Sequence, residues 1–148
     1  MYNSQGGIAQ VVLSAKNGAS PYTTKYGYTQ NHLTSRIDGF GDADATTTAF
    51  EYEPDTGLLK KLTTTGTAWG AGLVTEYTYD LAGRPKTRKD PAQFTATRSY
   101  DPAGRLYQQV VCRGSPTCTN VATFSYVLDP VGNVQGERKE VNRRRRAA

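Results

Sequence analysis

The stretch YTYDLAGRPKTRKD (residues 77–90) decides the fold, and much of it returns as SYDPAGRLYQQVV (residues 99–111). Both copies contain Tyr-Asp-x-Ala-Gly-Arg. Residues two apart on a β-strand point to the same face, so Tyr77 and Tyr79 lie side by side. Asp80 then accepts backbone hydrogen bonds at the start of a turn, and Gly83 supplies a positive φ near its end. The motif therefore predicts a strand, a tight turn and a second strand.

The glycine of this turn recurs along the chain. The markers stand at positions 31, 57, 83, 104 and 132, at intervals of 26, 26, 21 and 28 residues. Stacked hairpins stabilise one another, whereas a single hairpin is marginal in water. We therefore assign the repeated residues a structural role in turns, with Asn31 replacing glycine because asparagine tolerates the left-handed region. These residues are Asn31, Gly57, Asp80, Gly83, Asp101, Gly104, Asp129 and Gly132.

Aromatic residues two apart precede most of the turns. The pairs are Tyr26/Tyr28, Phe50/Tyr52, Tyr77/Tyr79 and Phe124/Tyr126, and two extra residues separate the last pair from Asp129. The 10 tyrosines and 15 glycines suit half-buried strands and turns. We predict an all-β protein, an antiparallel β-meander of about 8 to 11 strands that forms an open, curved sheet segment. We expect no transmembrane helix, because no run of 18 apolar residues exists, and no signal peptide at the N-terminus.

The segments YTYDLAGR and SYDPAGR resemble the tyrosine-aspartate (YD) repeats of Rhs-type proteins. The same repeats occur in the C component of insecticidal toxin complexes and in teneurins. The resemblance covers roughly residues 26–134, and it implies a β-sheet that spirals into a hollow shell. In bacterial members the shell encloses a toxin, and the repeats are scaffold. We therefore expect a non-catalytic chain without cofactors, a partner in the rest of a shell or an enclosed toxin polypeptide, and an exported or cell-surface parent protein.

Five units are fewer than a closed shell needs, so we interpret the chain as a shell fragment. We divide it into an N-terminal segment (1–25), which is a degenerate repeat or an edge strand, a YD-repeat sheet (26–136), and a basic, disordered tail (137–148). The net charge of +5 includes four arginines at 143–146, which leaves +1 for the rest. We therefore expect no genuine nucleic-acid site beyond the charge of the tail.

Several other features have alternative interpretations. Cys112 and Cys118 flank a turn and are either reduced thiols or a local disulfide. The repeated aspartates could bind calcium or, at Asp129, cut the chain as they do at the end of bacterial shells, but turn formation explains them and we expect no metal. Tyr77, Tyr79 and Trp69 are the candidates for a carbohydrate- or protein-binding surface, which is the alternative function.

Overall fold

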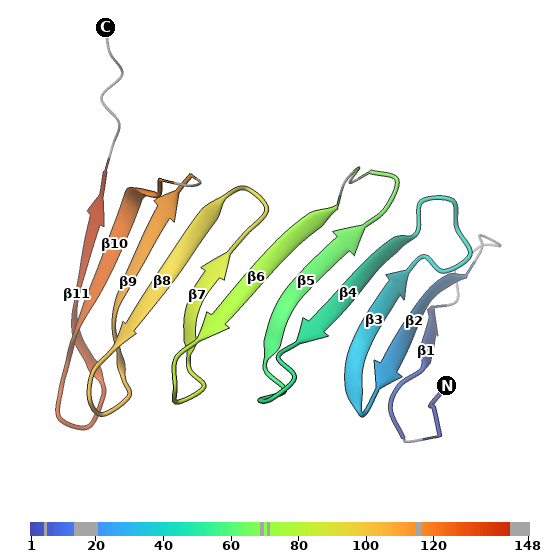
Figure 1. The fold of residues 1–148 in the computed structure, drawn as a ribbon, viewed down its shortest axis with the longest axis horizontal. Helices are drawn as coiled ribbons and strands as arrows, with labels where there is room; N and C mark the ends of the chain where they lie inside the picture. Colours follow the sequence, from blue (N-terminus) through green and yellow to red (C-terminus); the bar gives the residue numbers. More distant parts are fainter. Residues whose placement is uncertain (5, 14–20, 69, 71, 115–116, 143–148) are drawn as a thin grey trace, which may run out of the picture. The chain divides into compact units, whose positions relative to one another are not determined.

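The computed structural model describes residues 1–4, 6–13, 21–68, 70, 72–114 and 117–142. Within these ranges the chain forms eleven strands and no helix (Figure 1). The strands are β1 (Gln10–Leu13), β2 (Tyr22–Thr29), β3 (His32–Asp38), β4 (Thr46–Tyr52), β5 (Leu59–Thr65), β6 (Leu73–Tyr79), β7 (Pro85–Lys89), β8 (Phe94–Tyr100), β9 (Leu106–Arg113), β10 (Thr119–Leu128) and β11 (Val134–Val141).

Each strand lies next to its neighbours in sequence, in the order β1 to β11. The recorded pairings are all antiparallel. Among the described residues no further strand pairs with the outer side of β1 or β11, although Gln10 of β1 exchanges hydrogen bonds with Met1, so the sheet is open. The prediction of an open, all-β antiparallel meander is confirmed.

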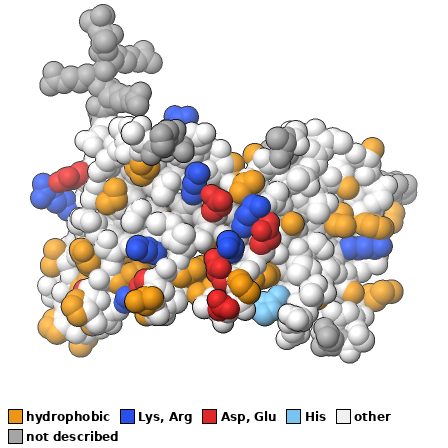
Figure 2. Space-filling model, viewed as in Figure 1, with side chains coloured by type: hydrophobic (Ala, Val, Ile, Leu, Met, Phe, Trp, Pro, Cys, Tyr) orange, Lys and Arg blue, Asp and Glu red, His pale blue; other side chains and the backbone are white. Residues whose placement is uncertain are grey.

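The chain divides into two units, Met1–Thr75 and Glu76–Ala148. Unit 1 contains β1 to β5 and the start of β6, and unit 2 contains the end of β6 and β7 to β11. No apolar side chain in the described residues is buried, and the buried residues among them are Thr24 and Gly39. Hydrophobic side chains are accordingly visible among polar ones on the face shown in Figure 2. Cross-strand pairs and backbone hydrogen bonds, and not a two-layer core, therefore hold each unit together.

The hairpins share one irregularity in register. In the β6–β7 hairpin the shift falls between Thr78 and Tyr79, and in the β8–β9 hairpin between Ser99 and Tyr100. In the β10–β11 hairpin it falls between Val127 and Leu128. Leu128 thus occupies the position of the second aromatic residue, directly before the turn aspartate. The interpretation of two inserted residues in the last unit is wrong, because the unit is SYVLDPVGN with leucine in the tyrosine position.

One further expectation, the extent of the tail, differs from the structure. Residues 137–141, which we assigned to the disordered tail, form the second half of β11. They pair with β10 up to Ala122↔Val141, and their charged side chains suit the solvent-exposed edge of a sheet. The turn at Asn31 has only two central residues, Gln30 and Asn31, with φ of 48° and 65°. It is one residue shorter than the turn after β6, because Asn31 is the third residue after Tyr28 whereas Gly83 is the fourth residue after Tyr79.

Candidate functional site

The turn after β6 is built by the carboxylate of Asp80. One oxygen accepts hydrogen bonds from the backbone N–H groups of Ala82 (3.0 Å) and Arg84 (2.9 Å), and the other accepts one from Arg84 Nε (2.7 Å). The backbone closes the loop, because Asp80 N donates to Arg84 O and Gly83 N donates to Asp80 O. The Asp-x-x-Gly-Arg motif is therefore a complete local hydrogen-bonding unit, in which glycine takes a φ of 76°.

The same unit recurs at the two later turns of unit 2. Asp101 accepts from Arg105 N (2.9 Å) and Nε (2.7 Å). Asp129 accepts from the backbone N–H groups of Val131 (3.0 Å) and Asn133 (2.8 Å), and from Asn133 Nδ2 (2.9 Å), so that asparagine replaces arginine. The glycines at 57, 104 and 132 have φ values of 67°, 83° and 99°.

The three turn aspartates are held in the charged form. The side chain of Arg84 lowers the pKa of Asp80, the backbone N–H of Arg105 lowers that of Asp101, and the side chain of Asn133 lowers that of Asp129. A carboxylate with a lowered pKa is a poor general acid, and its oxygens are already occupied by donors. The geometry at Asp129 therefore favours turn formation over cleavage of the chain. That the chain is not cut at Asp129 stays a prediction, which the intact mass of the purified protein would test.

Arginine and tyrosine connect consecutive turns within unit 2. The guanidinium of Arg84 lies over the ring of Tyr100, 4.6 Å from its centroid, and the hydroxyl of Tyr100 donates to Pro85 O at 2.8 Å. Arg105 Nη1 donates to Asp129 O at 2.7 Å and to Pro130 O at 3.3 Å. This role of the arginines was not predicted from the sequence, although an arginine follows the glycine in both best copies.

The tyrosine contact also occurs in unit 1. Tyr52 donates from its hydroxyl to Leu33 O at 2.8 Å, and its ring lies 4.8 Å from the His32 ring. Tyr28 makes the equivalent bond to Ile8 O at 3.1 Å. Each of these carbonyls, like that of Pro85, lies two residues after the turn residue with positive φ. The tyrosine before one turn is thus bonded to the strand that leaves the previous turn.

Two more turns of this kind escaped the sequence analysis. Near the N-terminus, Asn3 Oδ1 accepts from Gly7 N at 2.8 Å, Asn3 N donates to Gly7 O, and Gly6 N donates to Asn3 O. Between β7 and β8, Asp90 Oδ1 accepts from Phe94 N at 3.0 Å, and Gln93 takes the glycine position with a φ of 61°. The signals were YNSQGG, with asparagine for aspartate, and DPAQF, with glutamine for glycine.

Cys112 and Cys118 lie at the end of the β9–β10 hairpin. The structure joins their sulfur atoms in a disulfide, with the Cα atoms 5.4 Å apart. Cys112 is opposite Thr95 on β8 and Asn120 on β10. The disulfide therefore joins the end of β9 to the residue just before β10. Its place is that of a local clamp.

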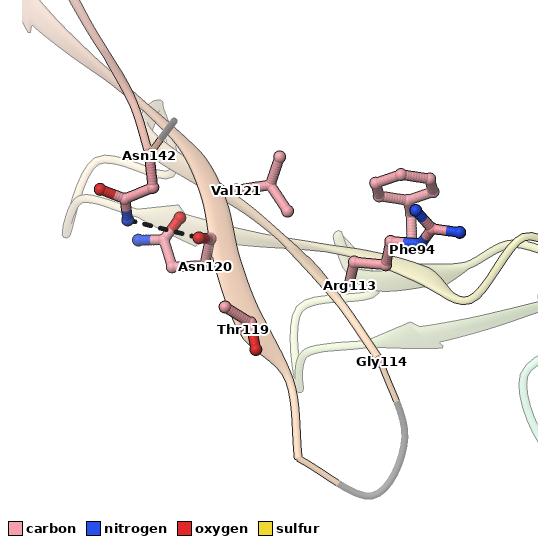
Figure 3. Close-up of a pocket in the computed structure, with 7 residues that line it drawn as sticks. All are labelled: Phe94, Arg113, Gly114, Thr119, Asn120, Val121 and Asn142. Atoms are coloured by element: carbon pink, nitrogen blue, oxygen red, sulfur yellow. Dashed lines mark hydrogen bonds between the residues drawn. The ribbon is translucent and has the colours of Figure 1, made fainter. Parts of the chain in front are cut away.

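An open cavity of about 710 Å³ lies next to this clamp (Figure 3). Its lining includes the ring of Phe94, the guanidinium of Arg113 and the amides of Asn120 and Asn142. Asn142 Nδ2 donates to Asn120 O at 3.3 Å, and Arg113 lies 5.2 Å from the Phe94 centroid. None of these residues was predicted from the sequence, because β8, β9, β10 and the end of β11 supply them and meet only after pairing.

Of the three residues predicted for ligand binding, the structure describes Tyr77 and Tyr79. Tyr77 and Tyr79 are half-buried on β6, and burial and the neighbouring Tyr77 raise the pKa of Tyr79. Trp69 lies outside the described residues. A carbohydrate- or protein-binding surface on these side chains stays a prediction, and a glycan array with Tyr77→Ala and Tyr79→Ala variants as controls would test it.

No group of three or more histidine, cysteine, aspartate or glutamate residues within the described ranges could hold a metal ion. No helix in the described part of the chain is long and apolar enough to cross a membrane.

No protein-family model and no curated protein matches the chain. Solved structures do match. In a crystal structure of TcdB2-TccC3-Cdc42, 95% of this chain aligns with 7% of that chain at 20% identity and a TM-score of 0.76. This chain has the fold of a segment of a Tc toxin complex.

Other Tc toxin structures agree. In a crystal structure of TcdB2-TccC3 the chain aligns over 95% of its length and 8% of that chain, with 19% identity and a TM-score of 0.74. In a mutant Tc holotoxin pore of Photorhabdus luminescens, 82% of this chain aligns with 5% of that chain, at 24% identity and a TM-score of 0.67. The chain thus spans less than a tenth of the length of the Tc chains that it matches. The fold expected from the resemblance to YD-repeat proteins, which include components of insecticidal toxin complexes, is confirmed.

Proposed function

We propose that this chain is a non-catalytic segment of a YD-repeat (Rhs-type) protein that contributes β-wall to a shell around a toxin or other cargo polypeptide. The observation that carries the proposal is the bonding between the successive repeat turns of unit 2, at Asp80, Asp101 and Asp129. Arg84 with Tyr100, and Arg105 with Asp129, connect consecutive hairpins. Repeats that stabilise their neighbours in this way extend a sheet without a core of their own.

The fold supports this proposal at the level of the Tc toxin complexes. A wall needs a sheet of one layer, and the described residues bury no apolar side chain against a second layer. It also needs edges that continue, and in the described part of the chain residues 11–13 of β1 and the outer side of β11 are open to another strand. The parent protein, on this proposal, is exported or exposed at the cell surface.

A graft tests the proposal. Residues 1–142 would replace the aligned segment of the matched chain in the Photorhabdus luminescens Tc complex, and the protection of the enclosed polypeptide from added protease would be measured. We expect an assembled complex with the polypeptide protected, because the turn contacts continue from repeat to repeat. A scrambled segment of equal length is the control and should expose the polypeptide. An assembled complex that leaves the polypeptide open to protease would contradict the wall function.

A further inference from the structure

One face of unit 2 combines aromatic rings with positive charges. The strand registers place Arg88, Ala96 and Val111 in one row across the sheet, and Arg98, Gln109, Phe124 and Lys139 in another. Phe94 and Arg113 lie directly opposite each other in a third. Tyr77 pairs with Arg88 and so shares this side. We call it the aromatic face, and its cations are Arg88, Arg98, Arg113 and Lys139.

These cations have rings or amides as neighbours in place of carboxylates. Arg113 lies 5.2 Å from the Phe94 centroid, and Lys139 Nζ lies 5.4 Å from that of Phe124. Arg98 Nε donates to Gln109 Oε1 at 3.1 Å. Arg88 is exposed. Among the described residues no carboxylate is within ion-pair distance of these four side chains.

The opposite face of the same strands has its charges in pairs. Lys89 lies 3.8 Å from Glu76, and Arg138 lies 2.8 Å from Glu140. On the aromatic face itself, the one acid among the described strand residues is Glu137, opposite Tyr126. The two faces of unit 2 therefore differ in uncompensated charge as well as in aromatic content. A general excess of basic residues does not explain this difference.

Unit 1 gives an internal comparison. The face that carries Tyr26 also carries Arg36, directly opposite in the register. There the guanidinium pairs with Asp38 at 2.8 Å, and Asp38 also accepts from Thr24 Oγ1. The positive charge at the corresponding place in unit 1 is thus neutralised within the fold, whereas unit 2 leaves its charges available.

We propose that the aromatic face of unit 2 binds an extended, acidic polypeptide. Guanidinium groups match carboxylates in geometry, and arginine side chains supply most of the charge here. Arg98 and Lys139 lie three strand spacings apart, roughly 14 Å, which about four residues of an extended chain can span. The cavity at Phe94 and Arg113 lies at one end of this face and can take a larger side chain (Figure 3).

Nucleic acid fits the same face less well. Single strands bind by stacking their bases on exposed rings. Arg113 and Lys139 already lie over the rings of Phe94 and Phe124, so one side of each ring is occupied by the protein's own cation. The choice of a polypeptide also rests on the proposed wall function, in which this face would contact the enclosed chain.

Fluorescence anisotropy of a labelled ten-residue polyglutamate peptide tests the inference. The full chain carries Arg143→Gln to Arg146→Gln throughout, because those charges bind any polyanion. Arg113→Gln with Lys139→Gln removes two charges from the aromatic face. Lys89→Gln with Arg138→Gln removes two from the opposite face and is the matched control. We expect the first variant to weaken binding about tenfold at low salt and the control to weaken it less than about threefold.

Three results would overturn the inference. They are equal losses in both variants, no binding at low salt, or tighter binding of a single-stranded oligonucleotide or a neutral oligosaccharide. Circular dichroism of each variant shows that the strands are retained, so a lost fold is not mistaken for a lost site. The protease protection of the cargo in the grafted Tc complex distinguishes this inference from the wall function. A protected cargo with no peptide binding removes this inference alone, whereas an exposed cargo removes the wall function and leaves the peptide result standing.

Discussion

Arg105 Nη1 donates a hydrogen bond of 2.7 Å to the carbonyl oxygen of Asp129, 24 residues further along the chain. The same arginine closes its own turn by donating from Nε to Asp101 at 2.7 Å. One side chain thus completes one turn and binds the backbone of the next. This relationship explains how a sheet with no buried apolar side chain in its described residues keeps consecutive hairpins in place.

Arg105→Gln should therefore destabilise unit 2. It removes the bonds to Asp129 and Pro130 as well as the bond to Asp101, and we expect a loss of about 1 to 2 kcal/mol in the free energy of unfolding. Urea denaturation measures it. The control is Arg138→Gln, whose ion pair with Glu140 is largely exposed and should matter by less than about 0.5 kcal/mol. Equal effects of the two substitutions would contradict the bonding role of Arg105.

Gly104→Ala should also destabilise unit 2. Gly104 has a φ of 83°, and an added Cβ would lie 3.1 Å from Nη1 of Arg84. A left-handed alanine costs about 1 to 2 kcal/mol, before any movement of the arginine. Gly136→Ala is the control, because that glycine lies in β11 without a positive φ and its Cβ would meet Val127 at 3.8 Å. A thermal midpoint that falls in the control and not in Gly104→Ala would refute this account.

Gln93→Gly should stabilise the protein. Gln93 adopts a φ of 61° in the turn that Asp90 builds between β7 and β8. Glycine removes a strain of roughly 1 to 2 kcal/mol and loses about 0.5 to 1 kcal/mol through its greater freedom when unfolded. The thermal midpoint should rise slightly. Gln108→Gly, at a regularly paired position of β9 opposite Ser99 and Ser125, relieves no such strain and should lower it.

The sequence predicted the strands and turns well because their signals are local. An aspartate and a glycine three residues apart determine a turn by themselves, as at Asp80 and Gly83. The contacts between turns, such as Arg105 with Asp129, depend on register, which single motifs do not reveal. The β7–β8 turn was missed because Gln93 gives no glycine signal, although Asp90 supplies the bonds. The aromatic face and its cavity were missed because residues from β8 to β11 meet there only after pairing.

Reduction of the Cys112–Cys118 disulfide should lower stability without unfolding the sheet. The bond closes a loop with a sequence separation of 6, and the chain-entropy estimate for a loop this short is about 2 kcal/mol. Intact mass after alkylation of the native protein should show no added group, and two should appear after reduction. Cys112→Ser with Cys118→Ser should reproduce the loss in thermal midpoint. Two alkylated thiols in the untreated, air-exposed protein would contradict the disulfide.

Stability should fall in acid because of the turn aspartates. The pKa values of Asp80 and Asp101 are lower in the folded protein than the ordinary value of 3.8, owing to hydrogen bonds from Arg84 and Arg105. In the interval between the folded and ordinary pKa values, the unfolded chain binds more protons than the folded one, so the free energy of unfolding rises with pH. This contribution is complete above the ordinary value and is lost as the pH falls through the folded values. Asp80→Asn with Asp101→Asn should flatten urea midpoints measured between about pH 5 and pH 2.5. An unchanged slope in the double variant would show that the turns carry no such linkage.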